Sequence, residues 1–110
     1  MTPISNTGGG RHQSERATEI IAHAAAEFVA REAGTESLIT VIRAESVAHG
    51  ERALVFVSVF PEEKAPHALA FLARRRATFS DYLKQHTHLR LPRVDFLLDN
   101  GELVGEYQKN

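Results

Sequence analysis

The chain has 110 residues, 43% of them hydrophobic, and a formal net charge of −1. This length suits one compact domain with a modest core and is too short for two. The absence of cysteine excludes disulfide bonds and thiolate metal sites. The first residues lack the apolar segment of a signal peptide, and no stretch approaches the length of a membrane span. We therefore expect a small cytoplasmic protein.

A first helix is predicted after a polar start. Residues 1–12 are rich in glycine, and we expect them to form a flexible leader. From Ser14, the expected N-cap, the apolar residues recur at helical spacing. They are Ala17, Ile20, Ile21, Ala24, Phe28 and Val29. We expect the helix to end near Ala33, with Gly34 as a left-handed cap.

A β-hairpin is predicted next. The segments 38–47 and 53–60 are rich in β-forming residues and flank a turn that contains His49 and Gly50. The second segment is apolar except for Ser58, which predicts a central strand that is covered on at least one face.

A third strand is predicted near the end of the chain. Residues 93–99 alternate, so that Val94, Phe96 and Leu98 should share one face, with Asp95 and Asp99 on the other, exposed face. A turn at Asn100 and Gly101 should follow, and residues 101–110 form a short polar tail.

Between the hairpin and the third strand, one helical pattern is interrupted halfway. The helix should start near Ala65, and its apolar stripe should continue at positions that are occupied by Arg75 and Arg76. Either a straight helix lets the stripe drift across Ala73 and Ala77, or the helix bends and turns the arginines outward. We expect the bend. The aromatic residues beyond it, Phe79 and Tyr82, are expected in the core.

These elements together predict an α+β fold in the order α-β-β-α-(kink)-α-β. A connection through two helices returns the chain to the same edge of the sheet, so the third strand should lie parallel to its neighbour. The result is a three-stranded mixed sheet with the helices on one face.

Charge is distributed unevenly along this chain. Residues 74–93 contain six lysines and arginines against one acidic residue, Asp81, which gives this segment a charge of +5 and the remainder −6. Such asymmetry is typical of proteins that bind a phosphate backbone, although a basic helix can also balance an acidic neighbour.

Several positions, taken in order, resemble the ribosome-binding factor A family over roughly residues 11–100. In the hairpin these are Thr40, Val41, Glu45, Ser46, Ala53, Val55, Val57, Ser58 and Val59; in the third strand, Pro92, Val94, Phe96 and Asp99. The resemblance implies a type II KH-like domain over residues 13–100. It also implies a non-enzymatic factor that binds the immature small (30S) ribosomal subunit and its 16S rRNA and assists late rRNA processing.

The same resemblance places the family's helix kink at Ala77 and Thr78, because Phe79 aligns with the aromatic residue that follows it. No glycine is present there, so the approach of the backbone to RNA could be looser than in the family. The basic run before the kink could offset this through contacts with phosphates. The expected RNA-binding residues are Arg74, Arg75, Arg76, Ala77, Thr78, Lys84, Arg90 and Arg93.

Other functions receive less support from the sequence. The six histidines, including His86 and His88, lack a metal-binding spacing, no serine has a nucleophile-elbow setting, and we expect no enzyme activity, cofactor or small-molecule substrate. The alternative to RNA binding is a small α+β module that binds a protein partner or dimerises through its sheet. We expect a monomer.

Overall fold

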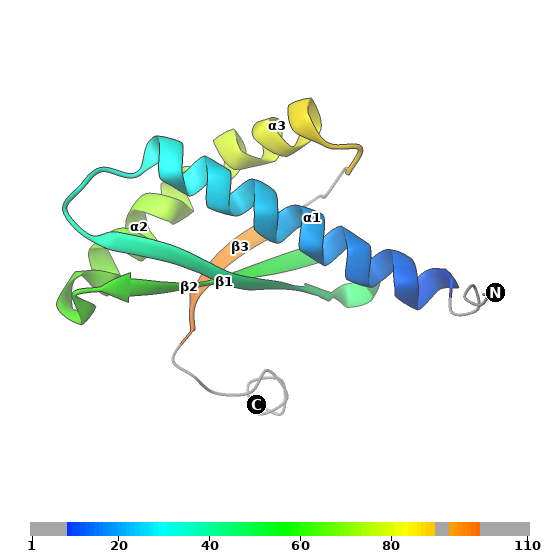
Figure 1. Ribbon diagram of the computed structural model, residues 1–110, viewed down its shortest axis with the longest axis horizontal. Helices are drawn as coiled ribbons and strands as arrows, with labels where there is room; N and C mark the ends of the chain where they lie inside the picture. Colours follow the sequence, from blue (N-terminus) through cyan, green and yellow to red (C-terminus); the bar gives the residue numbers. More distant parts are fainter. Residues whose placement is uncertain (1–8, 90–92, 100–110) are drawn as a thin grey trace.

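The computed structural model describes residues 9–89 and 93–99. The elements follow the predicted order (Figure 1). They are α1 (Gly9–Glu32), β1 (Leu38–Val47), β2 (Arg52–Phe60), α2 (Ala65–Arg74), α3 (Arg76–His86) and β3 (Arg93–Leu98), with short 3₁₀ turns at Ala48–Gly50 and Glu62–Lys64.

The sheet has the order β1-β2-β3, with β2 in the centre as predicted. Strands β1 and β2 pair antiparallel, and β2 and β3 pair parallel. The register between β1 and β2 shifts at Ile42, which is a bulge in the edge strand. All three helices cover one face of the sheet, and we refer to the opposite side as the open face (Figure 1).

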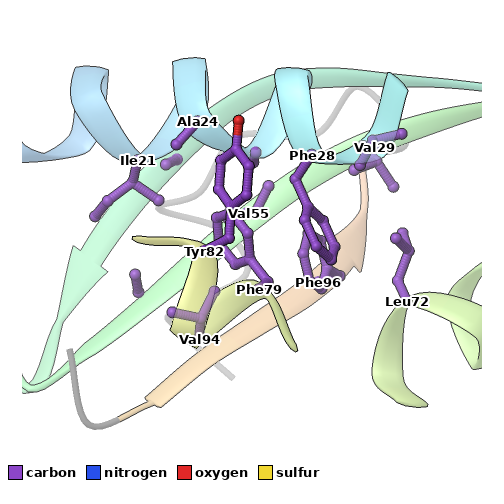
Figure 2. Packing of buried hydrophobic residues seen from close by; sticks show 14 of the residues in the cluster. Ile21, Ala24, Phe28, Val29, Val55, Leu72, Phe79, Tyr82, Val94 and Phe96 are labelled. Carbon is purple, nitrogen blue, oxygen red and sulfur yellow. The ribbon is translucent and has the colours of Figure 1, made fainter. Parts of the chain in front are cut away.

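The core lies between the helices and the sheet. Alternate residues of β2 face it, from Ala53 to Val59, and the aromatic residues Phe28, Phe79 and Phe96 meet in its centre (Figure 2). The ring of Phe79 lies 5.1 Å from that of Phe28 and 5.7 Å from that of Phe96. Because Phe79 is fully buried and Tyr82 is 9% exposed, both are core residues, as predicted.

The first helix differs from the prediction at both ends. It begins at Gly9, so Ser14 lies inside it and does not cap it, and residues 9–12 of the expected leader are helical. Extending an existing helix requires no new nucleation, which lets glycine join it. At the other end Gly34 does not have a positive φ. Five residues separate α1 from β1, so no tight left-handed reversal is needed.

The predicted bend in the second helical segment is confirmed, but its position is different. The break is at Arg75 (φ −99°, ψ 9°), whose backbone N–H donates to the carbonyl of Leu72 in an i→i+3 bond. Ala77 and Thr78 lie in the first turn of α3 and not at the kink. A negative φ is open to any L-residue, so this bend does not require glycine.

Candidate nucleic-acid interface

The break at Arg75 sends the three consecutive arginines in different directions. Arg74 ends α2 and is exposed, and no ion pair within residues 9–89 and 93–99 involves it. Arg75 pairs with Glu32 at the end of α1 and lies over the ring of Phe71, 5.6 Å from its centroid. The expectation that all three arginines point outward is therefore wrong for Arg75, whose guanidinium connects the break to α1.

Arg76, the first residue of α3, reaches a carboxylate on β3. Its Nη1 donates to Oδ1 of Asp95 at 2.5 Å. The other oxygen of Asp95 accepts from Nε of Arg52 at 2.8 Å and from Nε of Arg93 at 3.1 Å. We call these four residues the Asp95 cluster. It contains three cations and one anion, which leaves a formal charge of +2.

Asp95 is not the exposed acidic residue that the alternation of β3 predicted. It does lie on the open face, but its side chain is only 13% exposed because the three arginines enclose it. Burial alone would raise the pKa of this carboxyl. The hydrogen bonds from Arg93, Arg52 and Arg76 outweigh that effect, so the pKa of Asp95 is below its ordinary value. Asp95 therefore stays ionised and holds the arginines in place.

Beside this cluster, a groove of about 430 Å³ runs between α3 and β3. Its walls are Arg76, Ala77, Ser80, Asp81, Lys84, Arg93 and Val94. We call it the α3–β3 groove. The lining contains three cations and one carboxylate, that of Asp81, and Lys84 is exposed, with no ion pair inside the described part of the chain. Such a groove can hold an anionic chain by contacts with its charges.

Four of the eight predicted RNA-binding residues meet in this groove: Arg76, Ala77, Lys84 and Arg93. Arg74 and Thr78 are exposed but do not line it. Arg90 lies outside the described residues. Arg52 was not among the residues predicted from the sequence, because its position was expected to belong to the hairpin turn. Arg52 is the first residue of β2 and the register partner of Arg93.

The described residues provide neither a metal site nor a membrane-spanning helix. Within residues 9–89 and 93–99, no group of three or more histidine, aspartate or glutamate side chains is placed to hold a metal ion. In the same part of the chain, no helix combines the length and the hydropathy needed to cross a bilayer.

Comparison with solved structures places this arrangement in a known fold. The crystal structure of ribosome-binding factor A from Thermus thermophilus superposes with a TM-score of 0.69 and 25% identity, over 82% of this chain and 99% of that one. The chain has the ribosome-binding factor A fold. No protein-family model matches its sequence, and no curated protein matches it.

Two further structures of ribosome-binding factor A agree with this result. A homology model of the Thermus thermophilus protein, fitted into the map of a 30S complex, matches with a TM-score of 0.63 and 27% identity, over 76% of this chain and 91% of that one. A putative ribosome-binding factor A from Thermotoga maritima has a TM-score of 0.58 and 20% identity, over 93% and 94% of the two chains. The element order and the mixed sheet are those that the sequence predicted.

Proposed function

We propose that this protein is a non-catalytic assembly factor that binds the immature 30S subunit and its 16S rRNA and assists late maturation of that RNA. The observation that carries this proposal is the α3–β3 groove, where Arg76, Lys84 and Arg93 gather. The fold supports it as well, because the Thermus thermophilus protein with this fold has been fitted into the map of a 30S complex.

The cations of the groove would act through the phosphate backbone of the RNA. Arginine and lysine that neutralise phosphates release counterions, which supplies affinity but little sequence readout. Specificity would then come from the shape of the RNA and from neighbouring ribosomal proteins. Arg75 is left out of this proposed set of contacts because Glu32 already occupies its guanidinium.

The direct test is sedimentation of the purified chain with ribosomal subunits at moderate salt. We expect it to travel with 30S subunits that carry unprocessed 16S rRNA and not with 50S subunits. The triple variant Arg74→Glu, Arg76→Glu, Lys84→Glu should lose this association. Arg16 and Lys64 are exposed cations on α1 and before α2, so Arg16→Glu and Lys64→Glu serve as controls that should still bind. Equal sedimentation with both subunits would contradict the proposal.

One observation favours the alternative, a module that associates through its sheet. Leu38 and Phe60 are register partners at the end of the hairpin, and they are 66% and 71% exposed. Exposed apolar pairs of this kind occur at protein interfaces. If this surface carries the function, Leu38→Ser with Phe60→Ser should abolish self-association or partner binding, and the charge reversals in the groove should not. Analytical ultracentrifugation of the wild-type chain measures the self-association.

A further inference from the structure

The arginines of the Asp95 cluster come from three elements and meet at the edge of the sheet. Arg76 belongs to α3, Arg93 to β3 and Arg52 to β2. Arg76 and Arg93 also line the α3–β3 groove, whereas Arg52 does not. The cluster therefore connects the groove, on the helical side, with the open face, where Asp95 and Arg52 lie next to each other.

The charges of this cluster do not balance. Arg52 and Arg93 are register partners on neighbouring parallel strands, which places two positive charges next to each other. Asp95 compensates one of the three positive charges. A guanidinium has five N–H donors, and each of these arginines uses one nitrogen on Asp95. The side chains of Arg52 and Arg76 are each 43% exposed, so further donors face solvent.

The geometry points to a second phosphate-binding site at the Asp95 cluster, in which Arg52 is an RNA contact and Asp95 is the positioning residue. The path of the RNA backbone would run from Lys84 in the groove past Arg93 and Arg76, cross the edge at β3 and reach Arg52 on the open face. A phosphate at this point supplies the anion that the cluster lacks, through charge-assisted hydrogen bonds. This inference rests on the proposed function and extends its binding surface beyond the helical side.

The chain offers a matched control on the same face. Arg43 of β1 also points to the open face, because it is the register partner of Phe56, four residues from Arg52. Two carboxylates pair with it: its Nε lies 3.1 Å from Oε2 of Glu45, and its Nη1 lies 3.3 Å from Oδ2 of Asp99. It also lies over the ring of Phe56, 4.3 Å from the centroid. Arg43 therefore has the same charge as Arg52 and points to the same face, but two carboxylates already balance its charge.

The test is the salt dependence of binding to 30S subunits that carry unprocessed 16S rRNA. One lost phosphate contact reduces the slope of log K against log salt by about 0.7 to 0.9. When the salt concentration rises from 50 to 200 mM, both the wild type and Arg52→Gln should lose affinity. The factor by which affinity falls should be about three times smaller for Arg52→Gln. Arg52→Lys keeps the charge and should keep the slope, and Arg43→Gln should leave it unchanged. An unchanged slope in Arg52→Gln would overturn the inference.

A second measurement needs no variant and therefore does not depend on folding. Phenylglyoxal modifies accessible arginines, and mass spectrometry of peptides can compare the free chain with the chain bound to 30S subunits. Arg52 should become protected on binding, and Arg43 should change little. Modification of Arg52 at an equal rate in both states would contradict the site. If Lys84 and Arg76 contribute to binding and Arg52 does not, this inference fails while the proposed function stands; if the wild type does not bind 30S subunits, the proposed function itself fails.

Discussion

At the scale of single residues, Arg74, Arg75 and Arg76 are neighbours in the sequence but have different partners. Three adjacent arginines have three different surroundings: Arg74 faces solvent, Arg75 binds Glu32 and Arg76 binds Asp95. The sequence identified them as one basic run. It gave no sign of the partners, because Glu32 is 43 positions from Arg75 and Asp95 is 19 positions from Arg76.

Asp95 should make the stability of the fold dependent on pH. Its folded pKa is lowered, so its contribution is present above the unfolded pKa of about 3.9 and is lost as the pH falls through the folded value. Asp95→Asn should lower the free energy of unfolding by about 1 kcal/mol at pH 7. The loss is this small because the arginines are partly exposed to solvent. Urea unfolding at several pH values measures this difference, which should shrink below about pH 4. Asp81→Asn, at an exposed position, is the control, and a difference that is constant with pH would contradict this role.

The two glycines beside the first strand should respond oppositely to substitution by alanine. Gly50 has a φ of +86°, which L-residues rarely adopt, so Gly50→Ala should destabilise the fold by about 1 kcal/mol. Gly34 has no positive φ, and an added Cβ meets nothing within 4 Å. Gly34→Ala should stabilise by about 0.5 kcal/mol by restricting the unfolded chain. Thermal unfolding of both variants checks the pair, and a loss of stability in Gly34→Ala would show that its backbone is constrained after all.

At the scale of elements, the bend between α2 and α3 is what separates the basic residues. The sequence predicted a bend because two arginines interrupt an apolar stripe; the bend is present, but Arg75 pairs with Glu32 and does not point outward. The family resemblance placed the kink two residues too late, at Ala77 and Thr78. The observed position agrees with the pairing of Arg75 to Glu32, a contact between distant parts of the chain that no local pattern reveals.

The ion pair at this break should contribute to stability and not to RNA binding. In a double-mutant cycle, Arg75→Gln and Glu32→Gln should show a coupling energy of about 1 kcal/mol in urea unfolding. Arg75→Gln should also leave the salt dependence of 30S binding unchanged. Arg74→Gln, one position earlier and without an ion pair among the described residues, is the comparison. A lower salt slope in Arg75→Gln would return that residue to the RNA contacts.

The aromatic contact beneath α3 should be a main source of stability for the same element. Phe79 is fully buried between Phe28 and Phe96 (Figure 2). Phe79→Ala should therefore cost about 3 to 5 kcal/mol in free energy of unfolding. Phe71→Ala, at a partly buried position, should cost clearly less. Equal losses in the two variants would mean that the packing of α3 depends less on Phe79 than its burial implies.

At the scale of the whole molecule, the sequence was sufficient for the architecture and only partly for the site. Local periodicity predicted the helices and the third strand, β-forming composition predicted the hairpin, and the connection through two helices predicted the parallel pairing of β2 and β3. To predict the groove, one would have to know which side chains of α3 and β3 lie close to each other. Arg52 could have been found only from the register of β2 against β3, which places it beside Arg93.

We propose above that the uncompensated cations of the α3–β3 groove bind the phosphates of 16S rRNA. The most direct test compares Lys84→Gln with Lys64→Gln, since both lysines are exposed but only Lys84 lines the groove. The measurement is the affinity for 30S subunits across a series of salt concentrations. We predict that Lys84→Gln lowers the slope of log K against log salt by about 0.7 to 0.9 and that Lys64→Gln does not change it. Identical slopes for the wild type and both variants would contradict the claim.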